Sequence, residues 1–159
     1  QLRDSAKSQS QIQLGFTRAE DVFRCFPGRA DLDDSVRKDT SVSMRWRFTY
    51  TNDWAWCSRE VPEGRLAMVK EMRFWVKSDR EGTIGVRLDE ADGESFLALV
   101  PVGQDWRQET QTLANFTAFA GNGRLEPEKI TKVMVVDGSG MEDDARGERT
   151  LWFADFTFE

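Results

Sequence analysis

Strict alternation of hydrophobic and polar residues is the dominant pattern of this chain, and it is clearest between residues 42 and 50. Val42, Met44, Trp46, Phe48 and Tyr50 occupy every second position, and the residues between them are polar or charged. A helix would spread these hydrophobic residues around its circumference, whereas an extended strand gathers them on one face. The pattern therefore predicts a half-buried β-strand.

The same pattern predicts further strands at the spacing typical of a sandwich or barrel. They are expected over residues 72–77, 83–89, 95–100, 106–113, 132–137 and 150–158, with an early strand within 11–17. Residues 95–100 are almost continuously apolar, which predicts burial on both faces, whereas the polar segment Ala30–Thr40 is expected to be a loop. Helical signals are limited to single turns within 61–71 and 127–130.

The length and composition of the chain indicate its domain organisation. A chain of 159 residues fits one domain, so we expect a single all-β domain over residues 1–159, with residues 1–10 as a disordered N-terminal extension. The formal net charge of −6 argues against nucleic acid as a partner, because an acidic chain has no electrostatic attraction to phosphates. The sequence contains no run of about 18 apolar residues, so no membrane-spanning segment is predicted.

The absence of histidine from the sequence bears on catalysis. It removes the usual general base near neutral pH and the commonest zinc ligand. No nucleophile elbow, phosphate loop or zinc motif is present either. We therefore predict that the protein is not an enzyme, although a pair of carboxylates or the single tyrosine, Tyr50, leaves a glycosidase or lyase as an alternative.

Two cysteines, Cys25 and Cys57, have no metal-ligand spacing. Two interpretations stay open: a disulfide formed in an oxidising compartment, or two buried thiols.

The order of motifs along the chain resembles that of the galactose-binding-like β-sandwich carbohydrate-binding modules. The similar segments are Met72–Asp79, Asp105–Arg107 leading to Leu113–Phe116, and Leu151–Phe156, with Gln13–Asp21 as the opening strand. The complex I intermediate-associated family shares much of this pattern and is the second choice. The resemblance implies a jelly-roll β-sandwich of two antiparallel sheets, often attached to a polysaccharide-degrading enzyme, and therefore a secreted or periplasmic protein.

The resemblance also implies a structural Ca²⁺ ion that joins the first and last strands. Asp155 falls at the matching acidic position of the closing strand, and Glu20 or Asp21 would contribute from the N-terminal side. The departure is Ala154, where many relatives carry a second acid. The alternative is that Asp155 simply accepts a hydrogen bond from a loop.

A cationic outer face is the first candidate for a ligand site. If the hydrophobic residues of each strand point inward, the outward positions carry Arg45, Arg47, Arg73, Trp75, Lys77, Arg87 and Asp89, with Arg107 and Glu109 nearby. An aromatic plane stacks on a sugar ring, and guanidinium groups bind hydroxyls or carboxylates, so this set favours an acidic, uronate-containing polysaccharide. The alternative is a solvated face with alternating charges.

A tryptophan-containing loop is the second candidate. Trp54 and Trp56 follow the turn-forming residues Asn52 and Asp53, and Arg59 lies close in sequence. This loop either presents a stacking platform or caps one end of the core. The leading functional hypothesis is a non-catalytic carbohydrate-binding module of a larger extracellular protein. The alternative is a protein-interaction or assembly domain, in which the same tryptophans anchor a protein partner.

Overall fold

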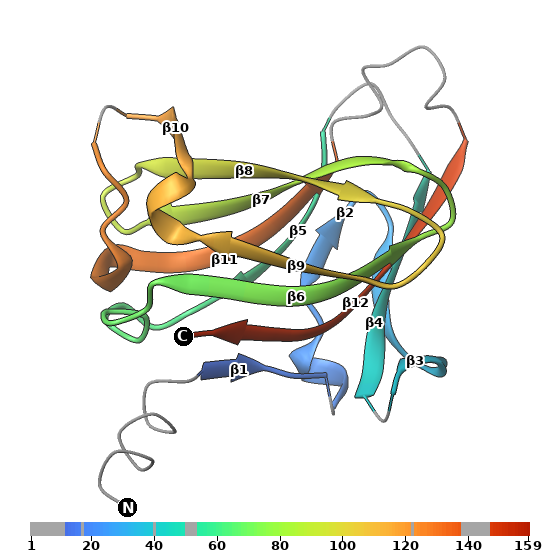
Figure 1. Ribbon diagram of the computed structural model, residues 1–159. Coiled ribbons are helices and arrows are strands. Elements are labelled where there is room, and N and C mark those ends of the chain that lie inside the picture. The colour runs from blue at the N-terminus through green and yellow to red at the C-terminus, as the bar shows by residue number, and fades with distance from the viewer. Residues whose placement is uncertain (1–11, 17, 40, 50–53, 122, 138–146) are drawn as a thin grey trace, which may run out of the picture.

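Two antiparallel six-stranded sheets pack face to face in the computed structural model, which describes residues 12–159 except 17, 40, 50–53, 122 and 138–146 (Figure 1). This arrangement confirms the predicted jelly-roll β-sandwich. The predicted N-terminal extension over residues 1–10 lies outside the described residues. No helix in the described part of the chain has the length and apolar character needed to cross a membrane.

The first sheet, called sheet A here, has the strand order β3-β4-β12-β6-β9, and β1 also pairs with β12. Its strands are β1 (Ile12–Leu14), β3 (Arg29–Lys38), β4 (Ser41–Thr49), β6 (Glu71–Ser78), β9 (Arg107–Thr112) and β12 (Glu148–Phe158). The opening and closing strands lie side by side, with Ile12 opposite Phe158. The long strand β12 is central, between β4 and β6, and most of its residues are buried.

The second sheet, called sheet B, has the strand order β10-β8-β7-β11-β5-β2. Its strands are β2 (Arg24–Phe26), β5 (Ala55–Glu60), β7 (Gly82–Glu90), β8 (Ser95–Val102), β10 (Thr117–Ala120) and β11 (Ile130–Asp137). In the described residues, 3-10 turns connect strands at η1 (Ala19–Asp21), η2 (Leu113–Asn115) and η3 (Pro127–Lys129). The last of these confirms the single turn predicted within 127–130, and successive backbone turns follow Pro62 as expected within 61–71.

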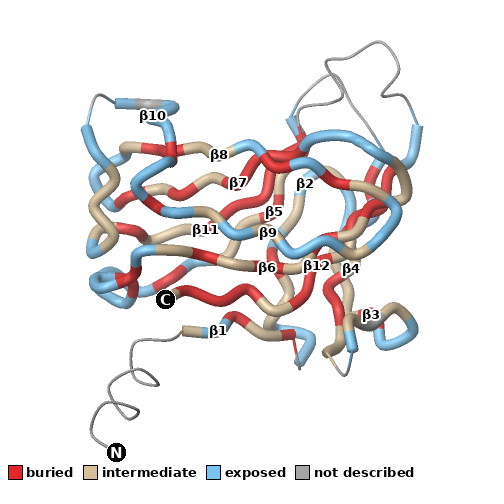
Figure 2. Tube along the Cα trace, viewed as in Figure 1, coloured by how far each residue is buried: buried red, intermediate tan, exposed pale blue. Residues whose placement is uncertain are grey.

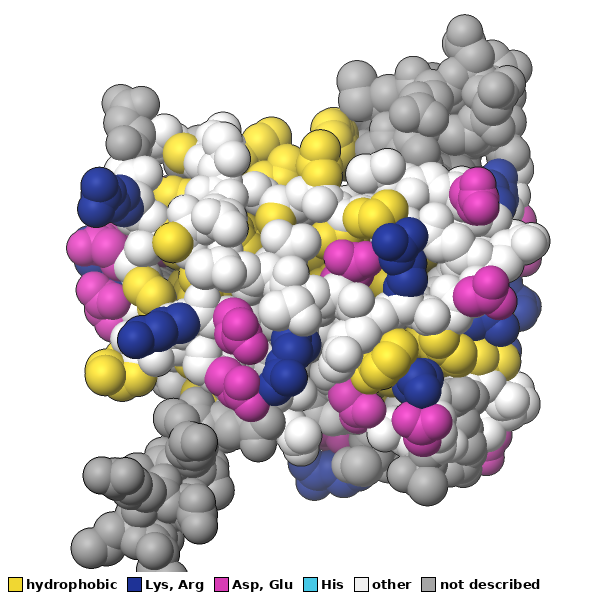
Figure 3. All heavy atoms as spheres, viewed as in Figure 1, with side chains coloured by type: hydrophobic (Ala, Val, Ile, Leu, Met, Phe, Trp, Pro, Cys, Tyr) yellow, Lys and Arg dark blue, Asp and Glu magenta, His cyan; other side chains and the backbone are white. Residues whose placement is uncertain are grey.

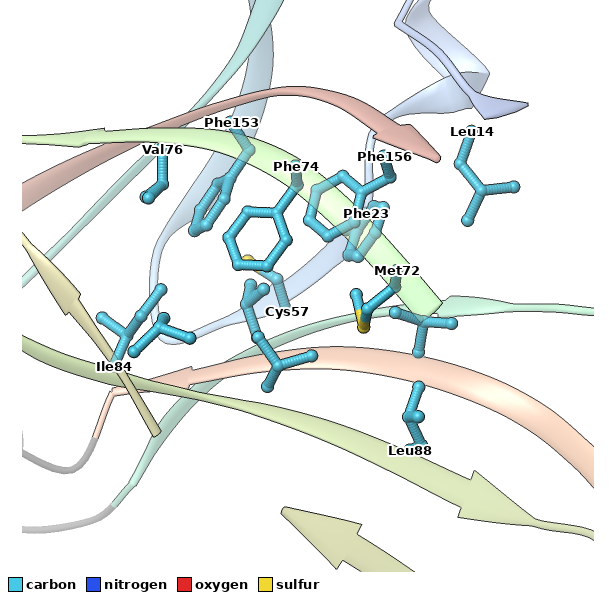
Figure 4. Packing of buried hydrophobic residues seen from close by; sticks show 14 of the residues in the cluster. Leu14, Phe23, Cys57, Met72, Phe74, Val76, Ile84, Leu88, Phe153 and Phe156 are labelled. Carbon is cyan, nitrogen blue, oxygen red and sulfur yellow. The ribbon is translucent and has the colours of Figure 1, made fainter. Parts of the chain in front are cut away.

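Large aromatic side chains fill the space between the sheets. Phe74 of β6 stacks on Phe156 of β12 with ring centroids 4.9 Å apart, and Phe153 and Phe23 pack around them (Figure 4). Buried and partly buried residues alternate along β6, whereas β11 and β12 are buried over most of their length (Figure 2). Of the inward set predicted for β4, Met44, Trp46 and Phe48 are buried, but Val42 is only partly buried and Ser43, predicted to face outward, is buried. Tyr50 lies outside the described residues.

Two predictions about individual segments were wrong. Segment 30–40 is not a loop, because Arg29–Lys38 forms the edge strand β3, and its register against β4 shifts between Asp33 and Arg37. The strand was not predicted because its sequence is polar, and an edge strand needs few hydrophobic residues. Segment 95–100 is not buried on both faces: Leu99 is 67% exposed. Its outward apolar residues belong to a surface described below.

The two cysteines form a disulfide bond between the directly opposed residues Cys25 and Cys57 of β2 and β5. Of the two interpretations that the sequence leaves open, the disulfide is therefore the one that the structure contains. The bond ties the short edge strand β2 to sheet B.

Candidate functional site

The outer face of sheet A carries most of the predicted cationic residues, and each arginine has an acidic partner. Arg45 lies 3.5 Å from Asp33, Arg47 lies 3.5 Å from Glu148, and Arg73 lies 2.6 Å from Glu159. Arg107 and Glu109 on β9 also pair, at 3.2 Å. This face therefore has the alternating charges of the solvated-face interpretation.

Trp75 and Trp152 lie on the same face, and both are covered by lysine side chains. The Lys38 ammonium is 4.3 Å from the Trp75 ring centroid, and the Lys77 ammonium is 5.5 Å from that of Trp152. Each lysine provides a cation–π contact at the point where a sugar ring would stack. A glycan would have to displace these lysines before it could reach either indole.

Asp33 organises the edge of this sheet. It is 6% exposed and accepts hydrogen bonds from the indole Nε1 of Trp152 at 3.1 Å and from the backbone N–H groups of Ser35 and Val36. Burial alone would raise the pKa of Asp33, but hydrogen bonds from the Ser35 side chain, from Trp152 and from the two backbone groups outweigh it, so the pKa is lowered. The buried carboxylate explains why a polar segment forms strand β3.

We expect Asp33→Asn to lower the free energy of unfolding at pH 7 by about 1–3 kcal/mol, because the one amide oxygen cannot replace both carboxylate oxygens, which accept from Trp152 and from the Ser35 and Val36 N–H groups. A lowered folded-state pKa means that this contribution is present above the unfolded-state pKa and is lost as the pH falls through the folded-state value. Urea unfolding should show the difference between variant and wild type shrinking below about pH 4. Asp31→Asn is the matched control, and a difference independent of pH would contradict the assignment.

The outer face of sheet B has a different character, because an apolar band crosses it from edge to edge. The pairing aligns Leu99, Gly85, Val136, Trp56 and Phe26 across five neighbouring strands. At a strand spacing of about 4.8 Å, five aligned strands extend about 19 Å, the scale of an oligosaccharide. Of the five exposed large hydrophobic side chains among the described residues, four lie on this face: Phe26, Trp54, Leu99 and Phe119.

A hollow of ≈190 Å³ lies in this band. It is lined by Trp54, Trp56, Arg87, Leu97, Phe119, Met134 and Val136. Gly85 lets the side chains of Val136 and Leu97 approach the backbone beneath the hollow. A Cβ at this position would lie 2.7 Å from Val136 Cγ2 and 2.9 Å from Leu97 Cδ1. Hydrophobic side chains gather along the top of the molecule over β8 in Figure 3.

Arg87 is the charged residue of the hollow, and its guanidinium is held in place. It pairs with Asp89 at 2.7 Å, donates to Ser95 Oγ at 3.1 Å and lies 5.3 Å from the Phe119 ring centroid. The prediction that Arg87 and Asp89 share a face with Arg45, Arg47 and Arg73 was wrong, because β7 belongs to sheet B and the other arginines belong to sheet A. Arg87 instead joins Trp54 and Trp56.

A second, polar hollow adjoins the other side of Trp56. It is lined by Glu20, Val22, Arg24, Trp56, Ser58, Arg59, Glu60 and Lys132. Arg59 donates a hydrogen bond to the backbone carbonyl of Asp21 at 3.2 Å. The structure therefore brings the predicted residue Arg59 next to Trp56, but in a separate polar region.

The residues expected to hold Ca²⁺ do not form a carboxylate cluster in the described part of the chain. Asp155 has a positive φ of 51° and accepts a hydrogen bond from Ser41 Oγ at 2.8 Å. Asp21 accepts the Arg18 backbone N–H, and Glu20 lines the polar hollow. The single group of three neighbouring carboxylates among the described residues is Glu90, Asp92 and Glu126.

Several residues of the apolar band were missed by sequence reasoning. Phe26 and Phe119 lie in the short edge strands β2 and β10, and Leu97, Leu99, Met134 and Val136 lie in β8 and β11, which carry apolar residues on both faces. Such runs are normally taken as buried strands. The sequence feature that could have indicated this surface is the presence of leucine, valine and methionine at the outward positions of neighbouring strands.

Comparison with known proteins agrees with the fold. No family model matches the sequence, and no curated protein does. Among solved structures, the chain is similar to a family 30 carbohydrate-binding module of a cellulosomal cellulase of Clostridium thermocellum, with TM-score 0.67 and 16% identity over 94% of this chain and 96% of that one.

Two further similarities extend this comparison. A family 11 module from the same organism, in complex with a β-1,3-1,4-mixed-linked tetrasaccharide, has TM-score 0.63 and 12% identity, over 93% of this chain and 86% of that one. An exo-β-agarase has TM-score 0.68 and 10% identity, over 86% of this chain but 23% of that enzyme. The fold is thus the β-sandwich of carbohydrate-binding modules.

Proposed function

We propose that this protein is a non-catalytic carbohydrate-binding module that binds a polysaccharide chain on the outer face of sheet B. The observation that carries the proposal is the apolar band with exposed Trp54, Phe119, Leu99 and Phe26. Aromatic rings of this kind stack on the apolar faces of sugar rings. None of the seven described residues that line the central hollow is a carboxylate, so this part of the lining does not supply the acid pair of a glycosidase.

The lining also favours an uncharged sugar over a uronate in the hollow itself. The positive charge of Arg87 is compensated by Asp89, and together they offer donors and acceptors to sugar hydroxyls. The agarase comparison, over 23% of that chain, fits a module within a larger protein. A disulfide bond suits a secreted or periplasmic location, because such bonds persist in oxidising environments.

A uronate-containing polysaccharide is the second candidate, favoured by the polar hollow beside Trp56. Arg24, Arg59 and Lys132 outnumber Glu20 and Glu60 there. A chain stacked on Trp56 would bring an acidic substituent within reach of these cations.

Binding measurements with a tryptophan variant on each face test the proposal. Isothermal titration with cello-oligosaccharides, a β-1,3-1,4-mixed-linked tetrasaccharide, agaro-oligosaccharides and oligogalacturonate should find one class that binds. Trp54→Ala should then weaken binding by about 30-fold, the loss typical of a central aromatic contact. Trp75→Ala on the opposite face is the matched control and should leave the affinity unchanged.

The opposite pattern, with loss in Trp75→Ala and none in Trp54→Ala, would overturn the assignment and place the ligand on sheet A. Selective binding of oligogalacturonate that depends on Trp54 would favour the second candidate. If the folded protein binds no polysaccharide, carbohydrate binding is contradicted. A protein partner at the same apolar band is then the function to test.

A further inference from the structure

Three carboxylates meet at one end of sheet B, away from the apolar band. Glu90 ends β7, Asp92 lies in the turn to β8, and Glu126 directly precedes η3. One carboxylate oxygen from each lies within 4.8 Å of the others. The turn backbone holds them close, because Glu90 N–H donates to Glu94 O at 2.8 Å and Ala91 N–H donates to Lys129 O at 2.9 Å.

Glu90 is the unusual member of the group. It is 3% exposed, and its Oε2 accepts the Glu126 backbone N–H at 3.1 Å. Its Oε1 is buried and has no hydrogen-bond partner among the described residues. Burial raises the pKa of Glu90, opposed by the Glu126 N–H and assisted by the negative charges of Asp92, Glu126 and Glu94. An ordered water or a bound cation would satisfy such a buried oxygen, and a cation would also supply positive charge to the three carboxylates.

Lys129 supplies part of that charge. Its ammonium lies 2.6 Å from Glu126 Oε2 and 3.5 Å from Asp92 Oδ2, but no ion pair to Glu90 is formed among the described residues. Three carboxylates against one ammonium leave the ionised group with an excess of negative charge. The lysine therefore neutralises the exposed side of the cluster and leaves the buried oxygen of Glu90 unsatisfied.

We propose that Glu90, Asp92 and Glu126 form a Ca²⁺ site, which the ion occupies in competition with the Lys129 ammonium. Three carboxylates offer up to six oxygen ligands, and exposed Asp92 leaves access for water, which suits an ion that takes six to eight oxygens. The absence of nitrogen and sulfur ligands in the group argues against zinc.

The site would join two parts of sheet B. Glu90 and Asp92 belong to the β7–β8 connection, whereas Glu126 belongs to the segment that leads from β10 into β11. A hydrogen bond from Gly123 N–H to Glu94 Oε1, at 3.1 Å, already links these segments. Bound Ca²⁺ would add a further link to this bond and to those from Glu126 N–H to Glu90 Oε2 and from Ala91 N–H to Lys129 O. It would also raise the melting temperature, as any ligand of the folded state does.

Calcium titration of the purified protein tests this proposal without any carbohydrate, so its failure and that of the proposed function are distinguishable. Isothermal titration after removal of metal by a chelator should give a dissociation constant of about 10⁻⁴–10⁻³ M, as in extracellular modules. Glu90→Gln and Asp92→Asn should each weaken binding about tenfold or more. Lys129→Met should strengthen it about tenfold, because the competing positive charge is gone.

Glu128→Gln is the matched control: it removes one exposed carboxylate of the same η3 turn, outside the group, and should leave binding unchanged. Asp155→Asn separates this site from the one implied by the family resemblance and should also have no effect. The proposal is overturned if neither the wild type nor Lys129→Met binds Ca²⁺. It is equally overturned if binding is lost in Asp155→Asn and kept in both Glu90→Gln and Asp92→Asn.

Discussion

Replacement of Arg149 by methionine is expected to lower the free energy of unfolding by about 3–5 kcal/mol, the cost of leaving a buried charge without its partner. Arg149 is the second residue of β12 in sheet A, and its Nη1 lies 2.8 Å from Asp137 Oδ2 at the end of β11 in sheet B. Both side chains are almost fully buried, at 2% and 0% exposure. The ion pair therefore joins the two sheets inside the sandwich.

The chain accommodates this guanidinium closely. Its Nη2 donates to Ser78 Oγ at 3.3 Å, and a Cβ on Gly82 would lie 3.1 Å from the same nitrogen. Methionine fills a similar volume, so the expected loss comes from the carboxylate of Asp137, which stays buried opposite an uncharged side chain. Urea unfolding at pH 7, analysed by linear extrapolation, measures the difference.

A double variant separates charge from packing. Arg149→Met combined with Asp137→Leu removes both charges, and apolar replacement of a buried ion pair is often close to neutral. The double variant should therefore be more stable than Arg149→Met alone. A loss below about 1 kcal/mol in the single variant would show that water or a relaxed neighbour compensates Asp137, and the ion pair would then not be a major contact between the sheets.

Much of the sandwich could be predicted from the sequence because the alternating pattern directly reflects burial on one face. Strand β4 is the clearest case, with Met44, Trp46 and Phe48 inward and Arg45 and Arg47 outward. The alternating pattern does not predict a strand whose buried positions carry polar residues. In β3 the buried residue at the edge is Asp33, whose hydrogen bonds replace hydrophobic contacts.

The candidate site could be predicted only in part because side-chain direction within a strand does not reveal which sheet contains that strand. Arg73 of β6 and Arg87 of β7 both point outward from consecutive strands, yet they lie on opposite faces of the sandwich. Trp54 and Trp56 were selected as a loop pair, whereas Trp56 lies in β5 beside Val136. Strand order, which depends on long-range pairing, decides which outward residues form a surface together.

Loss of the Cys25–Cys57 disulfide is expected to lower the free energy of unfolding by about 3–4 kcal/mol, from the chain entropy of a loop that spans 32 residues. The variant Cys25→Ala with Cys57→Ala tests this by urea unfolding beside the wild type in a reducing agent, and both should show a similar loss. A stable reduced protein would contradict the estimate. The wild type in oxidising buffer is the reference.

The same variant should weaken carbohydrate binding several-fold if the apolar band is the site. Strand β2 has three residues, and its ladder partner is β5, so the disulfide is the covalent link that holds Phe26 beside Trp56, with ring centroids 6.3 Å apart. Trp54 and Phe119 do not depend on β2, so binding should be reduced rather than abolished. Phe26→Ala in the disulfide-bonded protein is the matched comparison. An equal loss of affinity in both variants would indicate that the disulfide contributes to binding through the position of Phe26, whereas a larger loss in the cysteine variant would mean that it also supports β5 and the two tryptophans.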